Sequence, residues 1–346
     1  MSEKFARVLV FNPNGVMRTE LDVELESVSW RLDGVGMAKF SMSWNDPKCT
    51  KDNLKYGNRI LIQFSEDLGL PYWGGVIDVP RDVEYGVVSA TAYTGEHLLE
   101  WRETGKNDEY LTANPGYIVQ QMIIKSNAIW PTGMVLGDIY LGGTARSRTY
   151  HFHELYTQIK DLARLTGYDF CVRPVLSTGN VLTFAMDWFQ QRGLDRRNSV
   201  WLIDGSNAKE PKLKEQGNIA NKIMIAGAGT AWGAARPVSE VEDTASRDEY
   251  DYREWAEVQS GVADQDTLDL NAAEILTEMK DAKKKITISA TNEGPAGFDA
   301  YGVGDIVTAS LFVDNQEWYF EAPVRILARA WEPDHSCRLE VEEWTR

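Results

Sequence analysis

Apolar residues that alternate with polar ones between positions 57 and 99 constrain the fold of this chain more than any other feature. Residues 58–64 place apolar side chains on one face with a period of two, which is typical of a strand with one buried side. Residues 73–77 and 88–93 continue the extended pattern after turn residues. This meander predicts a small β-barrel.

Turn chemistry marks where these strands bend or end. Gly74 and Gly75 predict a β-bulge or a close crossing of strands. Near the N-terminus, the sequence NPNG at 12–15 separates two apolar runs. It predicts a hairpin turn, because Asn and Gly tolerate positive φ.

Three motifs in this region, GNRILIQF, WGGVID and AYTGEHLL, resemble the first barrel of phage tail-tip and baseplate hub proteins. That family includes the N-terminal hub part of tail-associated lysins. SVSW at 27–30 and GMAKFSM at 36–42 resemble the hairpin that opens the family's first barrel. Residues 218–227 resemble the first strand of its second barrel, and residues 304–307 and 324–327 resemble its closing strands. The resemblance spans nearly the whole chain.

The resemblance implies a structural protein of the virion rather than an enzyme. In the family, three copies form a ring in which two related barrels per chain give six similar units, so that a threefold object fits a sixfold tail tube. The implied partners are the distal tail or tail tube protein, the tape-measure protein and a tail fibre or spike. We therefore expect a homotrimer that surrounds the DNA channel at the tail tip or baseplate.

The expected fold class is mixed β with α+β insertions, built from two small β-barrel domains, an α+β insert and a helical, acidic insert. Residues 1–99 are expected to form the first hub domain, and residues 100–203 an inserted α+β domain. Residues 204–238 and 286–346 are expected to form the second hub domain, interrupted by the acidic and helical insert at 239–285. A chain of 346 residues exceeds the length at which one core keeps growing, which favours several units.

Helical periodicity supports the inserted α+β domain. Asn114, which precedes a proline, is expected to cap one helix, and a second helix is expected over residues 154–164. Gly167 is expected to stop that second helix. Residues 168–175 and 181–186 then predict a hairpin.

The second insert is strongly acidic. Residues 239–257 hold eight acidic and two basic side chains, a local balance of −6. Beyond them, Asp269 or Asn271 is expected to cap a helix, with Lys280 and residues 283–285 near its C-terminal end, where the helix dipole favours cations. We interpret the acidic segment as a solvated surface rather than a ligand site.

The overall charge argues against stable binding of nucleic acid. The chain has 36 Lys and Arg against 52 Asp and Glu, a formal net charge of −16, so its surface repels phosphate backbones. The same charge would suit the wall of a channel along which DNA slides. Simple solubility is the alternative explanation.

Cysteine usage and the N-terminus indicate synthesis in the host cytoplasm. Cys49, Cys171 and Cys337 are odd in number and form no CxxC pair. The N-terminus has no signal-peptide pattern, and no apolar run approaches the roughly 18 residues that would indicate a membrane span. We expect no membrane span, and release by host lysis if the protein acts outside a cell.

The sequence assigns no catalytic, cofactor-binding or metal-binding residue, and we expect no cofactor. His151 and His153 would share one face of a strand, which can suit zinc, but no third Cys or His lies nearby. Gly227 and Gly229 form only a GxG before Trp232, without a complete phosphate-binding motif. A serine nucleophile motif GxSxG is absent too.

Two alternatives stay open. Facing carboxylates and exposed tryptophans would suit a β-rich cell-wall hydrolase or a carbohydrate-binding module. The sequence has many acidic residues, but it does not show that two of them face each other across a cleft. A hub of a contractile injection particle would keep the fold and change only its neighbours. Against a hydrolase, the chain ends where the second barrel would end, whereas tail-associated lysins carry an enzymatic module beyond that point. We therefore expect no enzymatic activity.

Overall fold

The computed structural model of the chain describes residues 5–229, 236–293, 296–312 and 319–344. The first hundred residues form mainly strands: β1 (Ala6–Phe11), β2 (Met17–Leu21), β3 (Glu24–Arg31), β4 (Met37–Ser43), β5 (Arg59–Phe64), β6 (Trp73–Glu84) and β7 (Val87–Thr94). A short 3-10 helix, η1 (Glu66–Leu68), and one helical turn, α1 (His97–Glu100), accompany them.

The middle of the chain mixes helices and strands: β8 (Asp108–Ala113), α2 (Pro115–Ile129), β9 (Met134–Ile139), β10 (Arg146–Tyr150), α3 (Leu155–Thr166), β11 (Asp169–Leu176) and β12 (Leu182–Phe189). The remainder comprises β13 (Trp201–Ile203), β14 (Ala208–Gln216), β15 (Lys222–Ala226), β16 (Val238–Glu242), α4 (Thr244–Tyr250), β17 (Glu254–Val258), α5 (Gln265–Met279), β18 (Lys283–Thr291), β19 (Ile306–Phe312), β20 (Tyr319–Trp331) and β21 (Ser336–Glu343).

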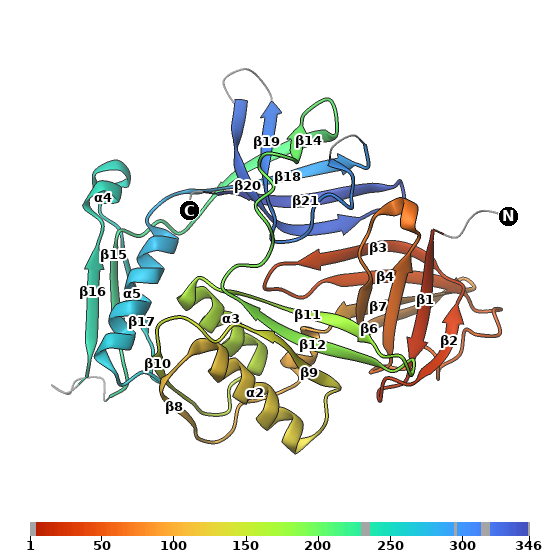
Figure 1. Cartoon of the computed structure of the whole chain (residues 1–346), viewed down its shortest axis with the longest axis horizontal. Helices are drawn as coiled ribbons and strands as arrows, with labels where there is room; N and C mark the ends of the chain where they lie inside the picture. The colour runs from red at the N-terminus through yellow and green to blue at the C-terminus, as the bar shows by residue number, and fades with distance from the viewer. Residues whose placement is uncertain (1–4, 230–235, 294–295, 313–318, 345–346) are drawn as a thin grey trace.

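Figure 1 shows how these segments are arranged. Strands β1–β7 lie at the right, and β14 and β18–β21 lie above. The α2–α3 region lies below, and α4, α5 and β15–β17 form a separate layer at the left.

One large sheet runs through both β-rich regions. Its strand order is β14-β18-β21-β20-β3-β4-β7-β6-β5-β1-β2, with β19 and β13 branching from β20. Strand β20 is the bridge, because Ile306–Phe312 of β19 pair with its first half and Val28–Arg31 of β3 pair with Ala328–Trp331. In its pairing with β21, strand β20 has a register shift between Ile326 and Ala328, at the point along β20 where its partner changes from β19 to β3.

The expected mostly β architecture is confirmed, but the barrels are not. Among the described residues, the strands form several sheets, none of which closes on itself. In the first region β2 and β3 are not paired with each other, and β3 instead pairs with β20. The edge that would close a barrel is therefore used to join the two β-rich regions.

Local predictions from turn and cap chemistry agree with the structure. Strands β1 and β2 flank the turn at 12–15, where Gly15 has φ +82°. The Asn114 side chain accepts a hydrogen bond from Gly116 N at the start of α2, and Gly167 ends α3 in the left-handed region. Strands β11 and β12 form the expected hairpin.

The paired glycines mark a close crossing rather than a bulge. A Cβ on Gly74 would lie 2.4 Å from Pro174 of β11, and one on Gly75 would lie 2.2 Å from the Tyr93 carbonyl oxygen. The register shift of β6 falls later, between Asp78 and Arg81. The absence of a side chain at Gly74 lets β11, and with it the region that contains α2 and α3, pack directly on β6.

Three expectations for the second half were wrong in detail. The strand expected at 218–227 exists as β15, but it pairs with β16 and β17 in a separate small sheet. Helix α5 starts earlier than expected, because the Asp264 side chain accepts a hydrogen bond from Thr267 N and caps it. Residues 283–285 belong to β18 rather than to the end of that helix.

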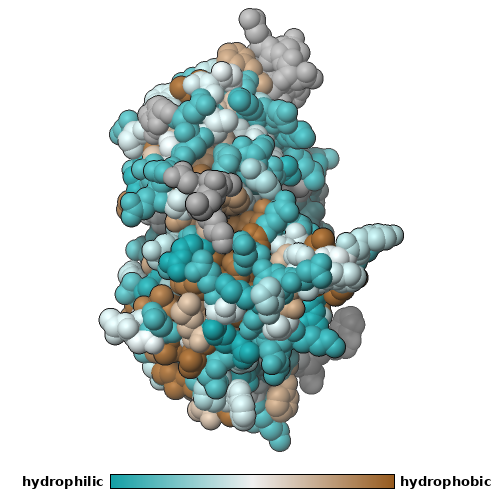
Figure 2. Space-filling view, turned by 90° about the vertical axis from the view of Figure 1, so that its right-hand side faces the viewer, coloured by the Kyte–Doolittle hydropathy of each residue, from teal (hydrophilic) through white to brown (hydrophobic). Residues whose placement is uncertain are grey.

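Three hydrophobic clusters fill the interior. The largest contains residues from both β-rich regions, among them Val28, Trp73, Ile288 and Trp331. A second lies between α2, α3, the β11–β12 hairpin and the outer side of β1 and β5. The third joins α5 to the small sheet and includes Leu165 of α3. Much of the surface near β1 and β2 is hydrophilic, with scattered apolar residues (Figure 2).

Candidate functional site

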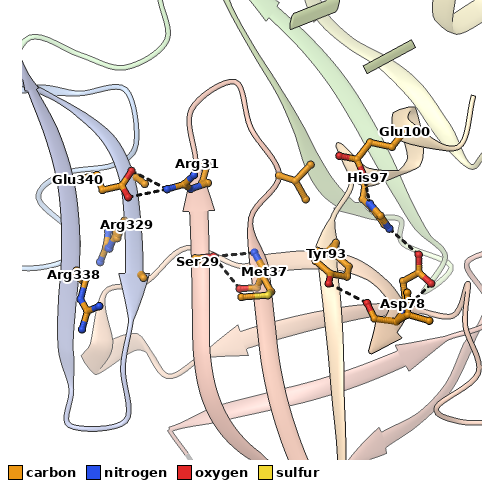
Figure 3. Close-up of a pocket in the computed structure, with 14 residues that line it drawn as sticks. Ser29, Arg31, Met37, Asp78, Tyr93, His97, Glu100, Arg329, Arg338 and Glu340 are labelled. Carbon is orange, nitrogen blue, oxygen red and sulfur yellow. Dashed lines mark hydrogen bonds and ion pairs between the residues drawn. The ribbon is translucent and has the colours of Figure 1, made fainter. Parts of the chain in front are cut away.

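A concave site with charged and apolar lining lies on the outer face of the large sheet, across the junction of β3 and β20. This cavity has a volume of about 660 Å³. Its lining comes from β3, β4, β6, β7, α1, β20 and β21 (Figure 3). Val35, Met37, Ala328 and Ala330 give it an apolar part, and charged side chains lie on either side.

His97 occupies one side of this cavity between two carboxylates. Its Nε2 atom lies 2.8 Å from Asp78 Oδ2, and its Nδ1 atom lies 2.5 Å from Glu100 Oε2 (Figure 3). The imidazole also packs against the rings of Tyr93 and Trp101, with centroid distances of 4.6 Å and 5.1 Å. Both ring nitrogens are therefore occupied, and the two aromatic rings restrict the imidazole further.

This arrangement does not form a nucleophile-activating pair. Two lining residues carry hydroxyls. Ser29 Oγ donates to the Met37 carbonyl oxygen and accepts from Met37 N, and the Tyr93 hydroxyl donates to the Val79 carbonyl oxygen. A nucleophile needs a base within hydrogen-bond reach, whereas both nitrogens of His97 face carboxylates. The geometry suits a rigid contact surface better than acyl transfer.

The opposite side of the cavity carries exposed ion pairs. Arg31 Nη2 lies 2.8 Å from Glu340 Oε2, and Arg338 Nη2 lies 2.9 Å from Glu332 Oε1. Exposed pairs of this kind contribute little to stability, typically about 0–1 kcal/mol. They are therefore available to exchange partners when another surface approaches.

Arg329 lies beneath the cavity and faces the core. It is only 1% exposed, and its Nη1 atom donates to the carbonyl oxygens of Phe298 and Tyr301. Its guanidinium also lies over the rings of Trp30, Phe298 and Tyr301, at 5.0–6.0 Å from their centroids. Aromatic faces stabilise such a cation. Arg329 thus fixes the loop at 298–301 against the bridging strand.

A buried cluster of ionisable groups lies where β3–β4, β11 and β20 meet. Arg325 forms an ion pair with Asp169, and Asp33 Oδ1 accepts a hydrogen bond from Phe170 N at 2.6 Å. Burial, and then the negative charge of Asp169, raise the pKa of the Asp33 carboxyl to about 8. Asp33 therefore holds its proton at neutral pH and can donate to Asp169.

Two further buried charges fix the α2–α3 region on the large sheet. Glu96 Oε1 accepts a hydrogen bond from Val172 N at 2.7 Å, and burial raises the pKa of this carboxyl. Arg59 donates to the carbonyl oxygens of Leu182 and Pro13, and burial lowers the pKa of its guanidinium. Each spans two regions, so these groups set the angle between them.

The residues considered from sequence for zinc do not share a strand face. Strand β10 ends at Tyr150, one residue before His151. His151 Nδ1 lies 2.7 Å from the Lys106 carbonyl oxygen, and His153 N donates to Thr104 Oγ1. Within the described part of the chain, no group of three or more His, Cys, Asp or Glu could hold a metal ion.

The glycine pair and the acidic segment also lie outside the cavity. A Cβ on Gly227 would lie 2.4 Å from the Val262 carbonyl oxygen, so this glycine serves close packing. Trp232 lies outside the described residues. The acidic segment 239–257 forms β16, α4 and β17, and its acids are mainly exposed.

Sequence reasoning missed Asp78, His97 and Glu100 as a cluster, as well as Asp33 with Asp169 and Arg325. His97 and Glu100 stand close together in AYTGEHLLE, but nothing local indicates that Asp78 meets them. Asp33 and Asp169 are brought together only by packing between regions. No helix within the described residues is both long and apolar enough to cross a bilayer.

Comparison with known proteins gives matches among solved structures. No protein-family model and no curated protein matches this chain. A tail protein from Neisseria meningitidis superposes with a TM-score of 0.61 at 13% identity, covering 98% of this chain and 97% of that one. The 43 kDa tail protein of prophage MuSo2 from Shewanella oneidensis gives 0.58 at 11%, covering 98% of both chains. The prophage tail protein gp18 from Listeria monocytogenes gives 0.58 at 12%, covering 97% and 94%.

These matches show the fold. The chain has the fold of prophage tail proteins over nearly its whole length. The resemblance seen in its motifs is confirmed at this level.

Proposed function

We propose that this protein is a structural hub of a phage tail tip or baseplate. In this proposal it forms a trimeric, pseudo-sixfold ring that joins the tail tube to the fibre or spike and surrounds the DNA channel. The observation that carries the proposal is the match of fold along the whole chain to three prophage tail proteins.

The two β-rich regions would act as the two barrel-like hub domains of each subunit. Residues 1–99 would form one, and residues 204–238 with 286–346 the other, with 100–203 and 239–285 as inserts. Strand β15 and the start of β16 fall within these bounds but belong to the small sheet of the second insert. The pairing of β3 with β20 supports the role of these two regions as adjacent units, since it joins both in one rigid sheet. A rigid pair of adjacent units is what a ring with two units per subunit requires.

The partners proposed for the ring are the distal tail or tail tube protein, the tape-measure protein and a tail fibre or spike. Its place would be the virion tail tip, after synthesis in the host cytoplasm. The net charge of −16 supports a channel wall that does not hold DNA, because acidic surfaces repel phosphates within about 8 Å at physiological salt. A hub of a contractile particle would share these properties and differ in its neighbours.

A cell-wall hydrolase or carbohydrate-binding module is the competing function. The cavity at β3 and β20, with Asp78 and Glu100 on one side, favours it most. Both carboxylates, however, contact the same imidazole, which leaves neither facing the other across open space. We propose that the protein has no enzymatic activity.

Symmetry and activity together test the proposal. Mass photometry and electron microscopy of the full chain should give threefold particles with a central opening. A stable dimer, or a single copy in intact virions, would contradict the hub. Incubation with peptidoglycan and labelled glycans should release no products, and reproducible cleavage that is lost in Asp78→Asn or Glu100→Gln would favour the hydrolase.

A further inference from the structure

Lysines gather on one part of the large sheet, although the chain as a whole is acidic. Strands β14 and β18 pair with Lys212 opposite Thr287 and Lys214 opposite Lys285. Alternate residues of a strand share a face, so Lys212, Lys214, Lys283 and Lys285 lie on the same side. We call these four residues the basic strip.

The basic strip belongs to the outer face of the sheet. Ile286 and Ile288 of β18 are buried in the main core, so their neighbours Lys285 and Thr287 face outward. Thr287 pairs with Glu340 of β21, which lines the cavity. The strip and the cavity are therefore parts of one continuous surface.

Internal ion pairs do not neutralise the strip. Lys283 Nζ lies 3.8 Å from Glu342 Oε1, and Glu342 also lies opposite Lys285. Among the described residues, Lys212, Lys214 and Lys285 form no ion pair, in contrast to Lys283 and Lys284. Glu340 lies on the same face of β21 but is paired with Arg31, so the four lysines and Glu342 leave a local charge of about +3.

Protection of a sheet edge does not account for this pattern. Lysines on β14 could keep that edge strand from pairing with other chains. Strand β18, however, is an interior strand with partners on both sides, and Lys285 lies directly opposite Lys214. Like charges directly opposite each other destabilise a sheet, so the isolated subunit gains nothing from this pair.

The same chain offers a complementary surface. Asp248 and Glu249 are exposed on α4, and the adjoining Asp251 is exposed at its C-terminal end. Only Arg247, 3.4 Å from Asp248, offsets this group within the helix. The structure shows no ion pair between these acids and the basic strip within one described chain.

We propose that the basic strip of one subunit binds the acidic α4 surface of a second copy of this chain. Charge identifies the occupant. Each copy carries both surfaces, and within the described chain only Lys283 of the strip and Asp248 of α4 have an ion-pair partner. Contacts between unlike surfaces of identical chains close into rings. The contact rests on the ring proposed above and names the surfaces that would build it.

A charge exchange on the full-length chain tests this contact. One variant carries Lys212→Glu, Lys214→Glu and Lys285→Glu, a second carries Asp248→Lys and Glu249→Lys, and a third combines all five. We expect wild type to assemble at about 50 mM salt and less at about 500 mM, as screening requires. Each single-sided variant should lose assembly at least tenfold, and the combined variant should regain it.

Matched controls separate the contact from net charge and from folding. Lys51→Glu, Lys55→Glu and Lys106→Glu change the net charge equally at exposed positions elsewhere and should leave assembly intact. A neutral variant with Lys212→Gln, Lys214→Gln and Lys285→Gln should remain folded, as measured by circular dichroism, and should still assemble poorly. If the control variant with Lys51→Glu, Lys55→Glu and Lys106→Glu also loses assembly, the proposed contact is overturned.

The other outcomes also decide. If wild type assembles and the strip variant assembles equally well, the contact is wrong while the ring stands. If wild type stays monomeric at every concentration, both the contact and the ring fail. If a short DNA duplex binds wild type, is lost in the strip variant, and assembly is unchanged in both, the strip is a nucleic-acid surface and the proposed contact is overturned.

Discussion

At the scale of single residues, the protein uses buried or partly buried ionisable groups to join its regions. Asp33, Glu96 and Arg59 each bond a backbone atom of a different region across the chain. A buried polar group is costly unless it is paired, so each of these contacts holds its region in one position. Precision of this kind would serve the proposed hub, whose subunits would have to fit identical copies.

Asp33 makes stability depend on pH. In the unfolded chain its carboxyl loses a proton near pH 3.8, whereas the folded protein holds it to about pH 8. Between pH 3.8 and about 8, the folded state therefore binds one more proton than the unfolded chain. The stabilisation from this group is fully present below pH 3.8 and is lost as the pH rises through about 8. Asp33→Asn removes the ionisation and keeps an oxygen acceptor for Phe170 N.

We expect the stability of Asp33→Asn relative to wild type to rise from pH 4 to pH 9, by at most about 1.4 kcal/mol per pH unit. Thermal unfolding followed by circular dichroism measures it. Asp82→Asn, the same exchange at an exposed position of β6, is the control. A constant difference between Asp33→Asn and wild type across this range would show that Asp33 is ionised in the folded state.

At the scale of elements, α5 ties the small sheet to the rest of the molecule through polar contacts. The buried Asn271 accepts a hydrogen bond from Arg146 of β10 and donates to Gln259. Burial, and then the charge of Arg148, lower the pKa of Arg146 to about 10. Arg164 of α3 adds ion pairs of 3.6 Å to Glu257 and 3.5 Å to Glu278.

Asn271→Ala should loosen this attachment. It removes the acceptor of a buried guanidinium, and we expect a loss of roughly 1–3 kcal/mol. Hydrogen exchange should quicken in β15 and β17 more than in the large sheet. Thr277→Ala, on the exposed side of α5, is the control. Equal effects of the two variants would mean that the Asn271 contact does not stabilise the attachment of the small sheet.

At the scale of the whole molecule, the fused sheet predicts that both β-rich regions unfold together. Val28 and Ile288 belong to one buried cluster although 260 residues separate them in sequence. Val28→Ala should cost roughly 1–3 kcal/mol and speed hydrogen exchange in β18 and β21 as much as in β4 and β7. Ile223→Ala, in the separate cluster under α5, should affect mainly the small sheet. Two resolved transitions for the two regions would contradict a single core.

The sequence by itself determined the local elements and, through its motifs, the similarity of its fold to that of phage tail proteins. Alternation of apolar residues predicts strands such as β5 and β7, and the Asn114 cap and Gly167 stop predict two helices, because these signals act within a few residues. The expectation that β5 has one buried side was wrong, because its second face packs in the cluster formed with α2 and α3. Only the tertiary structure decided that β3 pairs with β20 instead of closing a barrel, and that β15 leaves the large sheet. It also decided which charges meet, as with Asp33 and Asp169, or Lys214 and Lys285. Strand partners and buried ion pairs depend on burial summed over the whole chain, which no local pattern encodes.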